Sequence, residues 1–195
     1  MNILNTLRKI EDWDMVQQKT EYSLLFVLPM TWYLSLTFYY HLQSNLYMSF
    51  LDVVDFLVHE LGHRVFSIFG NQFLQILWGS LFQLIIPLAC LIWFYIQRDR
   101  FAVVFSYAWI GINFFYIATY AWDAQKMALP LMAIGSWDPI HDWNYILIHL
   151  WILRYTDAVA YGFRVLASIF FVIFFLNMFF ILLNKLRNLG DMFRF

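Results

Sequence analysis

The chain has 195 residues, of which 63% are hydrophobic and only 13% are charged, and its mean hydropathy is +0.64. A soluble domain carries roughly 25% charged residues, so this composition excludes an ordinary soluble domain and predicts an integral membrane protein. The formal net charge is −1, which gives no support to nucleic-acid binding, because that function needs clustered basic residues.

Apolar stretches separated by polar turns predict an all-α, polytopic helical bundle with four to six membrane segments, in one domain over residues 1–195. A helix of about 20 apolar residues is long enough to cross the hydrocarbon core. Residues 1–22 are polar and are interpreted as an amphipathic lead-in at the membrane surface, and residues 185–195 as a cytoplasmic tail. In chain order the predicted segments are 23–41, 49–69 (ending at a Gly70-Asn71 turn), 73–96, 101–122, a short one at 143–153, and 159–183.

Lysine and arginine gather at the N-terminus, in the loop 97–100, and after the last segment. The positive-inside rule places all three clusters in the cytoplasm. This arrangement requires the second segment to be re-entrant or partly immersed and the fifth to be interfacial or re-entrant, which leaves four full spans. The alternative has six spans, with both termini still in the cytoplasm and Arg98 and Arg100 outside.

The second segment contains the run His59-Glu60-Leu61-Gly62-His63 within apolar sequence. Residues i and i+4 share one face of a helix, so the two histidines can bind one Zn²⁺. Glu60 points about 100° away around the helix, where it can take a proton from water as a general base. Ionisable groups at membrane depth are costly, which favours a metal site over a solvated polar face.

Two carboxylates precede the histidines on the same helical stripe. Asp55 lies one turn before His59, and Asp52 a further turn back. A carboxylate that accepts the second N–H of a histidine ligand fixes its tautomer and strengthens it as a ligand. We therefore expect Asp55 to support the metal site, and Asp52 to extend that network or to face water.

The third metal ligand has to come from another part of the chain. Catalytic zinc sites have three protein ligands, and one straight helix cannot surround the ion. His141 is the first candidate, Asp142 the second and Asp123 the third. His141 and Asp142 stand where a polar connection re-enters apolar sequence, so their burial needs compensation. Asp142 could alternatively be only the N-cap of the following helix.

The third segment carries Gly79, Ser80 and Gln83. Small residues allow a helix or an extended substrate to approach closely. Gln83 is a candidate donor to a substrate carbonyl oxygen, in an oxyanion role. Packing between helices is the alternative interpretation of these residues.

These motifs resemble those of a known family. HELGH in a membrane segment, followed by Gly79, Gln83 and Pro87, resembles the site-2-protease-like intramembrane zinc metallopeptidases. The runs Trp122-Asp123-Ala124, Leu129-Pro130-Leu131 and His141-Asp142-Trp143-Asn144-Tyr145 resemble a group of small bacterial HExxH membrane proteins. The resemblance implies His59 and His63 as metal ligands, Glu60 as the base, and an acidic or histidine ligand downstream. Site-2 proteases take that ligand from a Leu-Asp-Gly motif, which this sequence does not contain.

We therefore expect a zinc metallopeptidase embedded in the bacterial inner membrane, with both termini in the cytoplasm. Its partners would be the lipid bilayer and a transmembrane protein substrate. The alternative is a non-catalytic metal-binding subunit of a larger membrane complex, with partner subunits in place of substrate. The alternative would explain why the sequence contains no large soluble domain for recruiting a substrate.

Overall fold

The structure is a computed structural model that describes residues 22–130 and 140–192. Within these ranges every regular element is a helix, so the predicted all-α fold is confirmed. The predicted lead-in falls almost wholly outside the described residues. The helices are α2 (Leu24–Gln43), α3 (Phe50–Ser67), α4 (Gln72–Ile96), α5 (Arg100–Asp123), α6 (Asp142–His149), the 3-10 turn η1 (Leu153–Tyr155) and α7 (Thr156–Met192).

The first four helices begin and end within two residues of the predicted boundaries. The last helix is longer than predicted, because α7 continues from the apolar span through the polar residues up to Met192. The predicted fifth segment is a single short helix, α6, followed by a turn and η1.

Three helical stretches are long and apolar enough to cross a membrane: α4, α5 and residues Leu153–Asn188, which comprise η1 and most of α7. This finding agrees with a membrane protein. Neither α2, which was predicted to be a full span, nor α3 is among them, and in α3 the charged residues Asp52, Asp55, Glu60 and Arg64 interrupt the apolar sequence.

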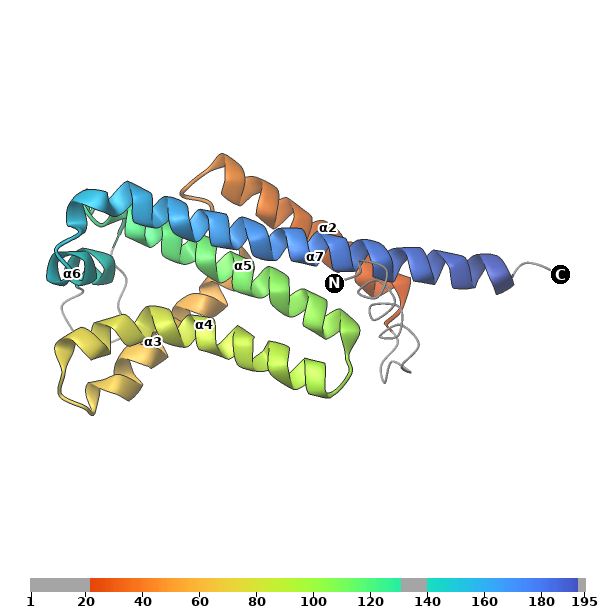
Figure 1. The fold of residues 1–195 in the computed structure, drawn as a ribbon, viewed down its shortest axis with the longest axis horizontal. Helices are drawn as coiled ribbons and strands as arrows, with labels where there is room; N and C mark the ends of the chain where they lie inside the picture. The colour runs from red at the N-terminus through yellow and green to blue at the C-terminus, as the bar shows by residue number, and fades with distance from the viewer. Residues whose placement is uncertain (1–21, 131–139, 193–195) are drawn as a thin grey trace, which may run out of the picture.

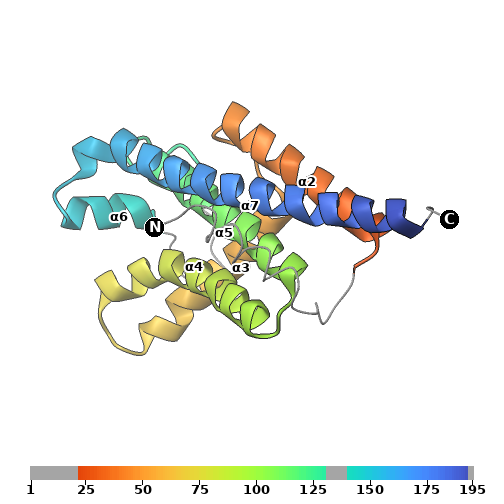
Figure 2. The same cartoon turned by 45° about the vertical axis from the view of Figure 1, so that its right-hand side comes forward.

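The helix α5 lies beside α7 along most of the length of α5, α7 continues beyond it, and α4 runs antiparallel to α5 (Figure 1). Gly111 permits the close approach of α5 to α7, because a Cβ there would lie 2.8 Å from the ring of Phe171. Buried phenylalanines such as Phe115, Phe171 and Phe174 fill this part of the core. The turned view in Figure 2 shows α6 at the same end of the bundle as the α3–α4 turn.

The helices α3 and α4 form a tight antiparallel pair. Gly70 makes the connecting turn with a φ of 65°, and the Asn71 side chain then accepts from Leu74 N at 3.0 Å and caps α4. The predicted turn at Gly70-Asn71 is confirmed. Gly62 allows the two helices to touch, because a Cβ there would lie 2.4 Å from the Trp78 carbonyl oxygen. This contact presses the histidine face of α3 against α4.

Candidate metal centre

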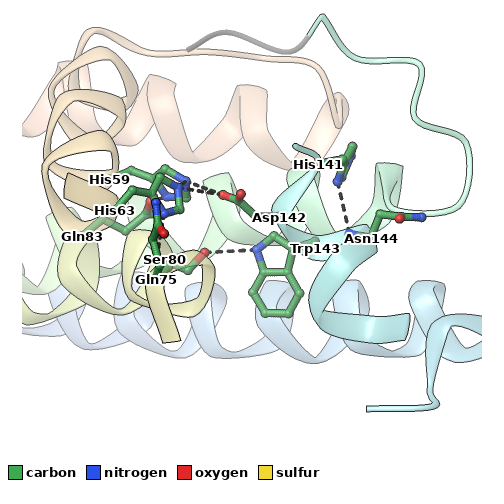
Figure 3. Close-up of polar contacts among 9 residues, drawn as sticks. All are labelled: His59, His63, Gln75, Ser80, Gln83, His141, Asp142, Trp143 and Asn144. Carbon is green, nitrogen blue, oxygen red and sulfur yellow. Dashed lines mark hydrogen bonds and ion pairs between the residues drawn. The ribbon is translucent and has the colours of Figure 1, made fainter. Parts of the chain in front are cut away.

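His59 and His63 lie one turn apart on α3, and their rings point to the same place (Figure 3). The Nδ1 atom of His59 donates to Gln83 Oε1, and that of His63 donates to the Gln75 carbonyl oxygen, both at 2.8 Å. Both acceptors belong to α4. Because these oxygens can only accept hydrogen bonds, each Nδ1 carries a proton, and each ring in its neutral form presents a lone pair on Nε2.

Three electron-rich atoms meet at one point. The Nε2 atoms of His59 and His63 are 2.9 Å apart, and Asp142 Oδ2 lies 2.6 Å from the first and 3.1 Å from the second. Lone pairs at this spacing repel one another unless a proton or a metal ion lies among them. Two imidazole nitrogens and one carboxylate oxygen also match the donor set of known catalytic zinc sites. The residues therefore fit a zinc ion.

Asp142 is the first residue of α6 and is 5% exposed. In the metal-free protein, burial raises the pKa of its carboxyl group, but hydrogen bonds and positive charge from His59 and His63 in their protonated form outweigh burial and lower that pKa. An anionic carboxylate in this position has the charge that a metal ligand needs.

His141 is the N-cap of α6 and faces away from the two α3 histidines (Figure 3). Its Nδ1 accepts from Asn144 N at 3.2 Å, so its Nε2 carries the proton and donates to Asp123 Oδ2 at 3.2 Å. Both ring nitrogens are thus engaged, and no lone pair is left for a metal. The geometry reverses the order predicted from the sequence: Asp142, rather than His141 or Asp123, reaches His59 and His63.

The residues that follow Asp142 fix the start of α6 to other helices. Trp143 Nε1 donates to Ser80 Oγ of α4 at 3.2 Å, and Asn144 Nδ2 donates to the carbonyl oxygen of Ala124, just after α5, at 2.7 Å. The carboxylate of Asp142 is therefore supported from two sides.

Glu60 lies next to this centre. One of its carboxylate oxygens and one ring nitrogen each of His59 and His63 all lie within 4.8 Å of one another. The side chain is half-buried. This position suits a group that exchanges a proton with a molecule held at the centre.

Gly79 of α4 forms the wall of the centre. A Cβ at this position would lie 2.4 Å from His63 Cε1, 2.6 Å from His63 Nε2 and 2.8 Å from His59 Nε2. Only glycine leaves room for both rings in their present places.

The sequence predicted that Asp55 would accept a hydrogen bond from His59, but Asp55 has a different partner. It is 1% exposed, and its Oδ1 accepts from Trp109 Nε1 of α5 at 2.8 Å. The acceptor for the His59 ring is Gln83, the residue for which the sequence suggested an oxyanion role. The contact between Gln83 and His59 was not predicted. Asp52 belongs to the capping box of α3 and lies 3.6 Å from His41 Nε2.

Two tyrosines were missed at the sequence level. The rings of Tyr116 and Tyr120 on α5 lie 6.5 Å and 6.4 Å from the ring of His59, and Tyr120 also stacks on His141. Their i, i+4 spacing, on the helix that ends at Asp123, is a signal that could have found them.

Comparison with known proteins gives no family: no family model matches the chain, and no curated protein or solved structure matches it.

Proposed function

We propose that the protein is a membrane-embedded zinc metallopeptidase in which His59, His63 and Asp142 bind the metal and Glu60 is the general base. The observation that carries this proposal is the convergence of three lone pairs within 3.1 Å while both Nδ1 atoms are held by acceptors. The position of Glu60 beside the two histidines adds the group that a hydrolase needs.

Zn²⁺, when bound, supplies a Lewis acid that polarises a scissile carbonyl group and makes water more acidic. Glu60 accepts a proton from the attacking water and returns it to the leaving amine. Gln83 and the Gln75 carbonyl hold the two imidazoles in the tautomer that leaves Nε2 free. Burial of His59 and Asp142 limits access of bulk water, which strengthens electrostatic interactions within the site.

We further propose four spans, with α2 and α3 together forming the first, α6 interfacial, and both termini in the cytoplasm of a bacterial cell. The start of α2, the α4–α5 loop and the late part of α7 lie together, because Tyr22 contacts both Asp99 and Lys185. In the six-span alternative, the loop and the C-terminal end of α7 would lie on opposite sides of the membrane. The contacts of Tyr22 therefore favour four spans.

The test of catalysis is the Glu60→Gln variant. We expect purified protein in proteoliposomes to cleave members of a panel of transmembrane peptides, and Glu60→Gln to retain zinc but lose cleavage by roughly 100-fold or more. The exposed Asp157→Asn exchange is the matched control. Retained cleavage in Glu60→Gln would contradict its role as base. A zinc-loaded wild type that cleaves no member of the panel would favour the non-catalytic subunit instead.

A further inference from the structure

One end of the helical bundle gathers three segments that are distant in the sequence. Tyr22, just before α2, donates its hydroxyl proton to Asp99 Oδ2 in the α4–α5 loop at 2.8 Å. Lys185 Nζ of α7 donates to the carbonyl oxygen of the same Tyr22 at 2.6 Å. The N-terminal entry, the α4–α5 loop and the late part of α7 therefore lie on one side of the protein (Figure 1).

The candidate metal centre lies toward the opposite end. Gly79, which touches both histidines, precedes the last residue of α4, Ile96, by 17 positions. At 1.5 Å per residue this distance is roughly 25 Å, most of the thickness of a hydrocarbon core. On α5 the nearby Tyr120 stands close to the end of the helix, while Arg100 stands at its start. The α3–α4 turn and α6 also lie at this far end (Figure 2).

The sequence is richest in basic residues in the segments that adjoin the first end. The chain has 12 lysines and arginines, and eight of them lie before Tyr22, in the α4–α5 loop region or near the C-terminus. Three lie at the end that holds the metal centre, and Arg164 lies within α7. The eight are Arg8, Lys9, Lys19, Arg98, Arg100, Lys185, Arg187 and Arg194, and the three are Arg64, Lys126 and Arg154. Short loops rich in lysine and arginine remain in the cytoplasm.

We infer that the His59–His63–Asp142 centre lies in the extracytoplasmic half of the membrane. For the proposed peptidase, on which this consequence rests, the substrate is a membrane protein segment cleaved near its extracytoplasmic end. Metal ions then enter from the same side. The orientation itself follows from the helix directions and the charge distribution, and it does not depend on catalysis.

Single-cysteine labelling of the full-length protein in intact bacterial cells tests this orientation. Cys90 is first replaced by alanine, and one cysteine is then placed at either end through Ala128→Cys or Asn188→Cys. Both positions are exposed and uncharged, so the charge distribution is unchanged. His149→Cys, also exposed, provides a second probe at the end of the metal centre. The probe is a membrane-impermeant maleimide, added before and after the cells are lysed.

We expect the cysteines at positions 128 and 149 to be labelled in intact cells, and the cysteine at position 188 only after lysis. The reverse pattern, or labelling of position 188 in intact cells, would overturn the inference. Because the measurement needs neither metal nor substrate, its outcome is separate from that of the peptidase proposal. If the purified protein bound no zinc, the proposed function would be contradicted, but the expected labelling pattern would not change.

Discussion

Asp142 connects the start of α6 to both histidines of α3 through one oxygen atom. Replacing it by asparagine keeps the size of the side chain but removes the charge and a ligand oxygen. We expect Asp142→Asn to weaken zinc binding by more than about 100-fold, beyond the roughly 10–100-fold that loss of an outer hydrogen-bond partner costs. Competition with a chelator measures this effect, with exposed Asp157→Asn as the control. Unchanged affinity in Asp142→Asn would remove it from the ligand set.

Gln83 and Asp55 give a second comparison among single residues. Gln83→Leu removes the acceptor that holds the His59 ring, so we expect zinc affinity to fall by roughly 10–100-fold. Asp55→Asn should leave that affinity unchanged, because its contact is with Trp109. The same chelator titration distinguishes the two. Weaker binding in Asp55→Asn together with unchanged binding in Gln83→Leu would restore the role predicted for Asp55.

The difference between these two residues shows what a sequence can and cannot supply. Asp55 precedes His59 by one helical turn, so the periodicity of the helix is enough to identify Asp55 as a candidate partner of His59. Gln83 is 24 positions away, and its contact exists because Gly62 and Gly79 let α4 approach α3 closely. That approach depends on how two helices pack, which the spacing of residues within one helix does not specify.

Among the elements, α4 fixes the geometry of the centre through Gly79. We expect Gly79→Ala to displace both rings and to lower zinc affinity by roughly tenfold or more, because its Cβ would lie within 2.8 Å of ring atoms of both histidines. Gly162→Ala in α7 is the control, since a Cβ there meets nothing within 4 Å and alanine favours a helix by about 0.5–1 kcal/mol. Equal zinc affinity in both variants would show that the wall at Gly79 is not required.

Variants at the start of α6 distinguish a metal ligand from a residue that only positions a ligand. His141→Asn keeps a capping oxygen for Asn144 N, and His141→Gln keeps a side chain long enough to approach Asp123. We expect each variant to weaken zinc binding by no more than about 10–100-fold, less than Asp142→Asn. His149→Gln on the same helix is the control. Loss of zinc as complete as in Asp142→Asn would identify His141 as a ligand.

The choice between His141 and Asp142 could not be made from the sequence for a related reason. His141 is the extended N-cap residue and Asp142 is the first helical residue, so their side chains point in different directions. Which of them faces α3 depends on how α6 is rotated, and that rotation is set by Trp143 on Ser80 and Asn144 on the Ala124 carbonyl. By contrast, the helix that carries HExxH and the turn at Gly70 follow from local signals, and both were predicted correctly.

For the whole molecule, metal binding and stability should be coupled. The centre joins α3, α4 and α6, whose residues are far apart in an unfolded chain. An ion that binds only the folded protein at about 100 times its dissociation constant adds about 2.7 kcal/mol of stability. The three-helix construction of the site thus predicts that chelators destabilise the wild type and leave Asp142→Asn unaffected.

Zinc binding by His59, His63 and Asp142 is tested most simply by the metal content of the purified full-length protein. After purification without chelators, elemental analysis should find about one zinc ion per chain in the wild type and almost none in Asp142→Asn. Asp157→Asn should retain the wild-type content. A wild-type protein that contains no first-row transition metal, and takes up none when zinc is added, would show that these residues do not form a zinc site.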